Sequence, residues 1–286
     1  MYTQDIEQVT IGEQVEVLPS GFARESKITS VVVPNSVTTI GANAFYGCTD
    51  LESVTLGTGV KNIGNYMFHE CHALNQISIP NSVTRIGDYA FNYCDGLGEI
   101  TIPSSVKNIG EGAFYWCTGL KNLVIPEGVD TIGKRAFYYC RELRSVDLPS
   151  TLTFIGAYAF FSDEHLGDVT CRATVPPRIE NVNCFYPAYD QAYADATLHV
   201  PASSVTEYKN ARYWSYFNHV NPIYVTIAGD VDADGRVSIA DVTELIDLLL
   251  NASPGMSDNS AADVDGDGRI SIADVTELID RLLNGN

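Results

Sequence analysis

Hydrophobic positions recur every 23 residues between Ser30 and Pro177, without insertion or deletion. Six copies of the pattern begin at Val37, Val60, Val83, Val106, Val129 and Leu152. In each copy an isoleucine followed by glycine, a phenylalanine and a leucine return at the same places, as at Ile40, Phe45 and Leu51 in the first. One copy is too short to bury these side chains, whereas copies stacked about 4.8 Å apart would share one core. The fixed period therefore predicts a repeat solenoid.

Each copy closes on an alternation of apolar and polar residues that predicts one short strand per coil. The apolar pair Val54 and Leu56 of the first copy returns at Ile77 and Ile79, Ile100 and Ile102, Leu123 and Ile125, and Val146 and Leu148. We expect these strands to pair between neighbouring coils. The glycine after each isoleucine, Gly41 in the first copy, indicates either a positive φ or a close approach between coils.

The pattern L-x-x-V-x-L, with its I-G, A-F and cysteine columns, resembles the BspA-like leucine-rich repeats of bacterial surface proteins. This resemblance implies a β-strand ladder with short helical or irregular convex segments. It also implies a secreted or surface-held bacterial protein whose role is adhesion to a protein or glycan ligand. Residues 1–7 are polar and lack the apolar region of a secretory signal, so either the chain is cytoplasmic or a signal has been removed, and the resemblance favours removal.

The flanks of the repeats differ in composition from the repeats themselves. Residues 1–36 are predicted to form an N-terminal cap coil before the solenoid at 37–177. The aromatic stretch 178–228 is predicted to cover the open edge of the last coil, with a strand over Ala196–Val200 and a helix over Ser203–Ala211.

Five of the seven cysteines share one repeat column, where a small buried apolar side chain is the simplest interpretation. They are Cys48, Cys71, Cys94, Cys117 and Cys140. The sixth copy has Asp163 in this column. Cys171 and Cys184 lie outside it and either form a disulfide or remain free.

A second repeat fills residues 229–286, where two similar halves, Gly229–Asn251 and Ala262–Asn284, each open with D-x-D-x-D-G after one residue. Acidic side chains at positions one, three and five converge on a hard divalent cation, and the glycine at six permits the sharp turn. The spacing predicts two calcium ions, one in each loop. In the first loop the expected ligands are Asp230, Asp232, Asp234, the carbonyl of Arg236, Ser238 through water, and Asp241. In the second they are Asp263, Asp265, Asp267, the carbonyl of Arg269, Ser271 through water, and Asp274.

Each calcium loop is followed by an amphipathic pattern that predicts one helix, and the two apolar stripes are expected to pack together. The stripes are Val242, Leu245, Ile246 and Leu249, and Val275, Leu278, Ile279 and Leu282. Aspartate stands at position twelve where an EF-hand has glutamate, and no helix is predicted before either loop. These features resemble the type I dockerin, a small all-α calcium-binding domain.

The dockerin resemblance implies calcium-dependent docking to a cohesin-type module, as in a cellulosome, by either of two near-identical faces. The residues implied are Ile239, Ala240, Thr243 and Leu245, or their twins Ile272, Ala273, Thr276 and Leu278. In the alternative, the module is an intramolecular clamp on the solenoid and no cohesin partner exists. Burial of both Ile239 and Ile272 would favour the clamp, and exposure of either would favour docking.

Two aromatic columns follow the phenylalanine column of the solenoid and are expected to form short ladders. Their members are Tyr93, Trp116 and Tyr139, and Tyr115, Tyr138 and Phe161. Aromatic ridges of this kind bind protein or sugar rings, or else pack against the coil edge.

The charge and the missing motifs narrow the function. A net charge of −19 and a pI near 4.4 argue against nucleic acid or an anionic membrane surface as a partner. No apolar run reaches the roughly 20 residues needed to span a bilayer. We find no nucleophile elbow, zinc-protease motif or phosphate loop, and we expect no enzyme activity. Residues 229–286 hold 13 acidic and 3 basic side chains, a net −10, so this module is expected to fold poorly without calcium.

Overall fold

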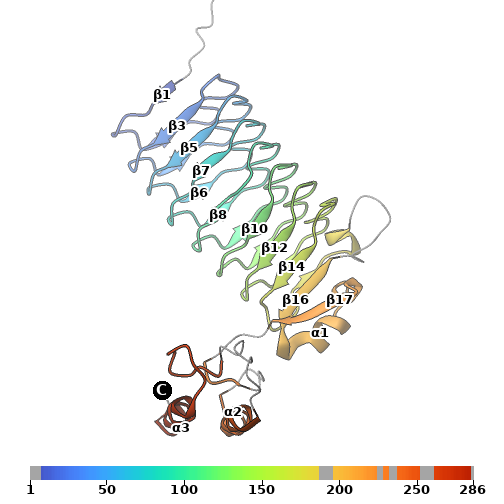
Figure 1. Ribbon diagram of the computed structural model, residues 1–286. Helices are drawn as coiled ribbons and strands as arrows, with labels where there is room; N and C mark the ends of the chain where they lie inside the picture. Colours follow the sequence, from blue (N-terminus) through green and yellow to red (C-terminus); the bar gives the residue numbers. More distant parts are fainter. Residues whose placement is uncertain (1–7, 187–195, 224–227, 232–236, 252–260, 285–286) are drawn as a thin grey trace, which may run out of the picture. The chain divides into compact units, whose positions relative to one another are not determined.

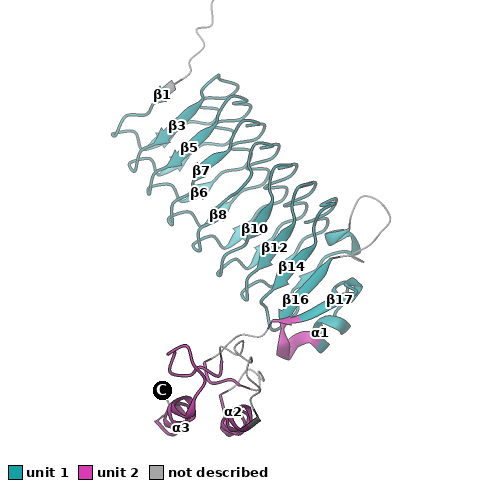
Figure 2. Ribbon diagram, viewed as in Figure 1, with its two compact units in different colours: residues 1–200, 206–221 teal, residues 201–205, 222–286 magenta. Residues whose placement is uncertain are grey.

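The computed structural model describes residues 8–186, 196–223, 228–231, 237–251 and 261–284. The chain divides into two compact units, one of residues 1–200 and 206–221 and the other of residues 201–205 and 222–286 (Figure 2). The first unit is a solenoid whose coils stack one on the next (Figure 1), as the fixed repeat period predicts. No helix in the described part of the chain is long and apolar enough to span a membrane.

The predicted strands form a parallel ladder along one face of the solenoid. Its N-terminal part has the order β1 (Gln8–Thr10), β3 (Ser30–Val33), β5 (Ser53–Leu56) and β7 (Gln76–Ser78). Its C-terminal part has the order β10 (Asn122–Val124), β12 (Ser145–Leu148), β14 (Asp168–Cys171), β16 (Thr197–Pro201) and β17 (His219–Ile223). Val54 pairs with Ile77 and Val146 with Val169, a shift of one full repeat in each case, so equal columns meet across coils.

A second ladder, which the sequence did not predict, runs through the isoleucine–glycine column. It consists of two parallel sheets. One pairs β2 (Val17–Leu18) with β4 (Thr39–Ile40), and the other has the order β6 (Asn62–Ile63), β8 (Arg85–Ile86), β9 (Asn108–Ile109), β11 (Thr131–Ile132), β13 (Phe154–Ile155) and β15 (Arg178–Ile179). The glycines here have no positive φ. A Cβ on Gly41 would lie 2.3 Å from the Ser20 nitrogen, and one on Gly156 would lie 2.4 Å from the Lys134 nitrogen. Close approach between coils therefore explains most of this glycine column, whereas a Cβ on Gly64 would meet its nearest atom only at 3.6 Å.

The predicted phenylalanine and cysteine columns form the centre of the core. Successive phenylalanine rings from Phe45 to Phe160 stack face to face at 5.0 to 5.4 Å between centroids. The cysteines are fully buried, and each thiol donates a hydrogen bond to a carbonyl of an earlier coil, as from Cys94 Sγ to the Phe68 oxygen at 3.1 Å. The cysteine column therefore fills the apolar core, and its thiol hydrogen bonds also join neighbouring coils.

The strand predicted around Ile100 and Ile102 is absent. Residues 98–103 have no strand structure, so the first ladder is interrupted between β7 and β10. On the opposite side the second ladder continues, because β9 pairs with both β8 and β11. The coils are thus in register, and only one edge of this coil is loosened.

The last coil is covered by the segment predicted to close the solenoid. Short helical turns η1 (Val182–Phe185), η2 (Ala202–Ser204) and η3 (Trp214–Tyr216) accompany α1 (Val205–Asn210) and strand β16, which starts one residue later than predicted. The Trp214 indole donates to the Pro177 carbonyl at 2.7 Å, and the Tyr208 hydroxyl donates to the Ala173 carbonyl at 2.8 Å. Cys171 and Cys184 are buried free thiols, so the disulfide alternative does not occur.

Asp163 replaces the last cysteine of the column and is buried in the same place. Neither of its carboxylate oxygens makes a well-formed hydrogen bond within the described chain. Burial raises the pKa of the Asp163 carboxyl well above its usual range, and the nearby main chain of Cys140 offsets only part of this effect. Burial therefore disfavours the ionised form of this carboxyl in the folded chain.

We expect Asp163→Cys to stabilise the solenoid at neutral pH. Because folding raises the pKa of Asp163, its contribution to stability is complete below the unfolded-state pKa of about 3.9 and falls as the pH rises towards the folded-state pKa. Both carboxyl oxygens are buried without a well-formed partner among the described residues, and an unsatisfied buried polar group costs about 1–3 kcal/mol, so the variant should gain about 1 kcal/mol or more at pH 7. Urea unfolding followed by tryptophan fluorescence at pH 5 and pH 8 measures this difference. If the unchanged protein and the variant lost equal stability between pH 5 and pH 8, this expectation would be contradicted.

Candidate functional site: an acidic two-loop module

Two helices of equal length form the second unit. They are α2 (Ile239–Asn251) and α3 (Ile272–Asn284), the predicted helices after the two acidic loops. Their shared core consists of Val231, Val242, Leu245, Ala262, Val264, Val275 and Leu278. The predicted packing of the two helices is therefore confirmed.

The helices agree only in part with the predicted arrangement. Leu245 and Leu278 were expected both in the packed stripes and on a docking surface; both are fully buried in the core between the helices, so the first prediction is confirmed and they cannot contact a partner. Conversely, Ile246, Ile279 and Leu282 were expected in the core and are 38%, 38% and 36% exposed. The helices turn a narrower stripe inward than the sequence pattern indicates, because the loops supply part of the core through Val231 and Val264.

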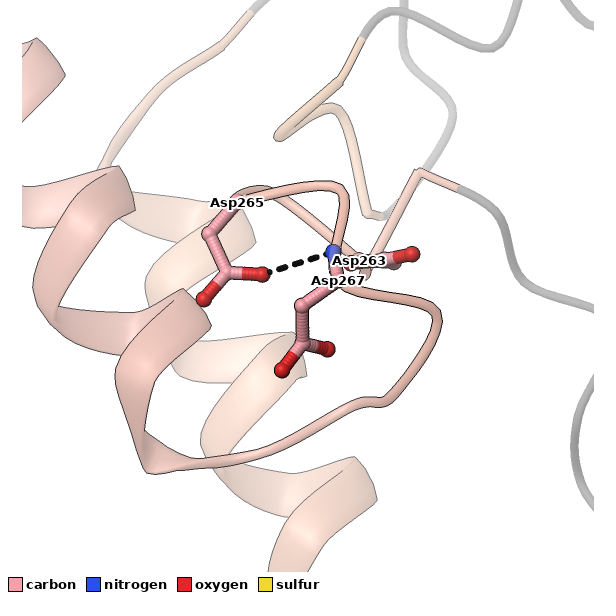
Figure 3. A group of neighbouring side chains, drawn as sticks. All are labelled: Asp263, Asp265 and Asp267. Atoms are coloured by element: carbon pink, nitrogen blue, oxygen red, sulfur yellow. Dashed lines mark hydrogen bonds between the residues drawn. The ribbon is translucent and has the colours of Figure 1, made fainter.

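The second loop gathers its acidic side chains at one point (Figure 3). One ligand atom each of Asp263, Asp265 and Asp267 lies within 4.8 Å of the others. Hydrogen bonds from loop N–H groups shape the turn. Gly268 donates to Asp263 Oδ2 at 2.9 Å, and Asp267 donates to Asp265 Oδ1 at 3.0 Å. Gly266 and Gly268 have φ values of 74° and 84°, which explains the glycines at these two places.

The aspartates at position twelve are buried and anchor each loop to its helix. Asp274 Oδ1 accepts from the Val264 N–H at 2.7 Å, and its Oδ2 accepts from the Ser271 N–H at 2.7 Å. Asp241 accepts from the Val231 and Ser238 N–H groups in the same way. Burial alone would raise the pKa of Asp274, but the hydrogen bonds from the backbone outweigh it and lower the pKa. Asp274 therefore stays ionised, and its oxygens keep lone pairs for a cation.

The donor set of the second loop fits calcium. Asp263 Oδ1 is buried and accepts no hydrogen bond within the described chain, although a buried carboxylate oxygen normally has a partner. Carboxylates with a carbonyl, such as that of Arg269, are the oxygen ligands that calcium prefers. The serine hydroxyls are engaged elsewhere, since Ser271 Oγ accepts from the Ala273 N–H and Ser238 Oγ from the Ala240 N–H. Their role through water remains a prediction.

The first loop repeats the second as far as the structure describes it. Asp232, Asp234 and Arg236 lie outside the described residues, while Asp230 is buried at the start of the loop. The Gly229 N–H donates to the Ala261 carbonyl at 2.8 Å and so joins the beginnings of the two halves.

The two helices carry two matching exposed stripes outside the core, which we call the docking stripes. They consist of Ile239, Thr243, Ile246 and Leu250 on α2, and Ile272, Thr276, Ile279 and Leu283 on α3. Ile239 is 74% and Ile272 73% exposed, and the two leucines are exposed to a similar degree. Ala240 and Ala273 lie exposed beside them. Leu250 and Leu283 were not predicted here, although each follows its isoleucine by nearly a whole number of helical turns and so shares the same helix face.

The aromatic columns of the solenoid form the predicted ladders, with their ring faces turned towards one another. Trp116 and Tyr139 stack at 4.5 Å with 7° between planes, and Tyr115 and Tyr138 stack at 4.8 Å with 5°. The guanidinium of Arg141 lies over the Tyr139 ring at 4.4 Å. Phe161 continues the second ladder and Tyr93 the first. All six rings are partly exposed.

The chain shares its fold and sequence pattern with known proteins. Residues 16–114 and 84–187 match the BspA type leucine rich repeat region in six copies, which together cover more than half of the chain, and residues 228–283 match the dockerin type I domain. The solved leucine rich repeat protein of T. pallidum is 29% identical, covers 60% of this chain and 83% of its own, and has a TM-score of 0.52. A leucine rich cell surface protein of Faecalibacterium prausnitzii A2-165 is 22% identical, covers 81% of this chain and 89% of its own, and has a TM-score of 0.39. None of the curated proteins matches significantly.

The family matches agree with two features of the structure. One is a fixed repeat stacked into a parallel ladder, and the other is a pair of acidic loops, each followed by one helix. The chain belongs to the BspA type leucine rich repeat proteins and carries a dockerin type I domain at residues 228–283.

Proposed function

We propose that this protein is a non-catalytic interaction protein, secreted or held at a bacterial surface, whose dockerin domain attaches it to a cohesin-type partner. The observation that carries this proposal is the pair of docking stripes. Four large apolar side chains, Ile239, Leu250, Ile272 and Leu283, are about three-quarters exposed on a domain whose core is already complete. Apolar surface of this kind, repeated on two helices, is typical of a protein-binding site.

Within the domain itself both isoleucines are exposed, so each stripe is available for docking. Each stripe lies outside the shared core, so a partner can bind without unfolding the domain. Because the two stripes have the same sequence, either can present to the same partner surface. We propose that the domain binds in either of two orientations.

We propose that each loop holds one calcium ion and that the ions hold the docking stripes in place. The residues that would hold the second ion are Asp263, Asp265, Asp267, the carbonyl of Arg269, and Asp274. Asp274 also accepts from the N–H groups of Val264 and Asp265, so it links the metal loop to the start of α3. Without a cation, the three close carboxylates repel one another and oppose this arrangement.

For the solenoid we propose a protein ligand rather than a glycan. Sugar rings bind to free aromatic faces, but the stacked pairs Tyr115–Tyr138 and Trp116–Tyr139 cover one face of each of these rings, and Arg141 lies over Tyr139. The exposed strand face carries mainly small polar side chains, which suit main-chain and side-chain groups of a protein. Adhesion through this face is part of the same proposal.

We expect removal of calcium to unfold the dockerin domain and leave the solenoid folded. Helices α2 and α3 have 13 residues each and α1 has 6, so the helical circular dichroism of the full chain reports mainly on the dockerin domain. Addition of EGTA to the full chain should remove more than about half of this helical signal, because metal binding supplies the folding free energy.

The two tryptophans provide an internal control. Trp116 and Trp214 both lie in the solenoid unit, so their fluorescence should not change with EGTA. Asp265→Asn should lower the calcium affinity of one loop and leave the other unchanged. Equal helical signal with calcium and with EGTA would contradict coupled binding and folding.

We expect single and double changes in the docking stripes to differ sharply in their effect on partner binding. With the full chain as bait for culture fluid and envelope proteins in calcium, Ile239→Asp or Ile272→Asp alone should weaken capture by no more than about twofold, since the other stripe remains. The double variant should weaken it by at least about 30-fold, as expected for the loss of a buried hot spot worth about 2 kcal/mol or more.

A matched control is Val175→Asp, which introduces the same charge at a 76% exposed valine of the solenoid unit, outside the strand face. This variant should bind as the unchanged chain does. Capture that persists in the double variant, or that is equal in EGTA, would show that the partner does not use the docking stripes.

A further inference from the structure

The interruption of the strand ladder opens a cavity on the polar face of the solenoid. The cavity has a volume of about 340 Å³ and lies between β5, β7 and residues 99–101. Its walls carry hydroxyl, amide and carboxylate groups from Ser53, Thr55, Gln76, Ser78, Glu99 and Thr101. Val54, Ile77 and Ile100 also line it. Figure 1 shows β5 and β7, the strands on its N-terminal side.

Main-chain groups that a regular ladder would use are left free at this cavity. The Gln76 N–H donates to the Glu52 carbonyl at 3.1 Å, as the ladder requires. In the described chain, the equivalent bond from the Glu99 N–H to the Asn75 carbonyl, one coil further on, is not formed. Main-chain groups away from water normally have partners, so a ligand that supplies partners here would be favoured.

The apolar side chains of one strand column are partly exposed only at this interruption. Val54, Leu123, Val146 and Val169 occupy this column and are at most 2% exposed. Ile77 and Ile100 belong to the same column and are only half-buried. A ligand with a short aliphatic segment would cover them.

Charge identifies the polar end of that ligand. The strand face carries three acidic residues, and two of them have basic partners within the solenoid. Asp147 pairs with Arg172 at 2.7 Å, and Asp168 lies 3.2 Å from His199. Glu99 has no ion pair among the described residues, and it is the acidic residue that lines the cavity. The site therefore has an unbalanced negative charge beside carbonyl, hydroxyl and amide acceptors.

We propose that this cavity receives an arginine or lysine side chain of a protein partner. The methylene groups cover Ile77 and Ile100, and the cationic head binds Glu99 and the free main-chain carbonyls at the interruption. The proposal rests on the proposed role of the solenoid as a protein-binding surface and is independent of the dockerin domain.

The test is a titration of the isotope-labelled full chain, in calcium, with Nα-acetyl-L-argininamide, followed by the amide resonances. Saturable shifts at Ile77, Ser78 and Thr101, with a millimolar Kd as usual for so small a ligand, are expected. Glu99→Gln should weaken binding by about threefold to fivefold, the range for a partly exposed ion pair. Glu207→Gln, which removes the same charge from an exposed position on α1, should not.

Three results would overturn the proposal: no shifts at the cavity, equal shifts with the neutral Nα-acetyl-L-glutaminamide or with cellobiose, or equal weakening in both variants. Each of them leaves the docking proposal intact, because capture of the cohesin-type partner is measured at the docking stripes. Loss of that capture with the cavity result unchanged would overturn docking alone.

Discussion

Main-chain hydrogen bonding between coils is the interaction on which the solenoid depends. Neighbouring coils bond through parallel strand pairs in two ladders, with a register of one full repeat between the paired strands of residues 30–171. This spacing explains most of the glycine column, because the backbone of the neighbouring coil already occupies the place of a Cβ at Gly41 or Gly156. It also explains the thiol column, because each cysteine both fills the core and bonds to an earlier coil. Asp163 breaks the column, and burial raises the pKa of its carboxyl.

The one-repeat register between coils also aligns residues that combine a strained backbone with an aromatic side chain. Tyr93, Trp116 and Tyr139 have φ values of 59°, 60° and 67°, at a turn where the first copy has Gly47 with φ of 68°. A left-handed conformation costs a residue other than glycine about 1 kcal/mol or more. Stacking of the rings across coils, at 4.5 Å between Trp116 and Tyr139, offsets part of this cost. The ladders thus contribute to the solenoid itself as well as to its surface.

In the dockerin domain, the fold depends on electrostatic repulsion between carboxylates and on its relief. Its loops bring aspartates together, and buried Asp241 and Asp274 tie these loops to the helices through backbone N–H groups. The helices that carry the docking stripes are therefore built on the acidic loops. A cation that neutralises the loops stabilises the partner-binding surface without touching it, which couples metal binding, folding and docking in one small domain.

The sequence alone determined the solenoid, its core columns, the capping segment and the two acidic loops with their helices, because each rests on a repeated local pattern. It did not determine the second ladder, since its very short strands carry no alternation. The interruption at residues 98–103 also escaped it, as Ile100 and Ile102 fit the strand pattern and only pairing across coils shows the missing bonds. The inward and outward faces of α2 and α3 were partly misassigned at Leu245 and Ile246. The physical reason is that burial there depends on loop residues, such as Val231 and Val264, that fold back onto the helices, and this packing is decided only in the tertiary structure.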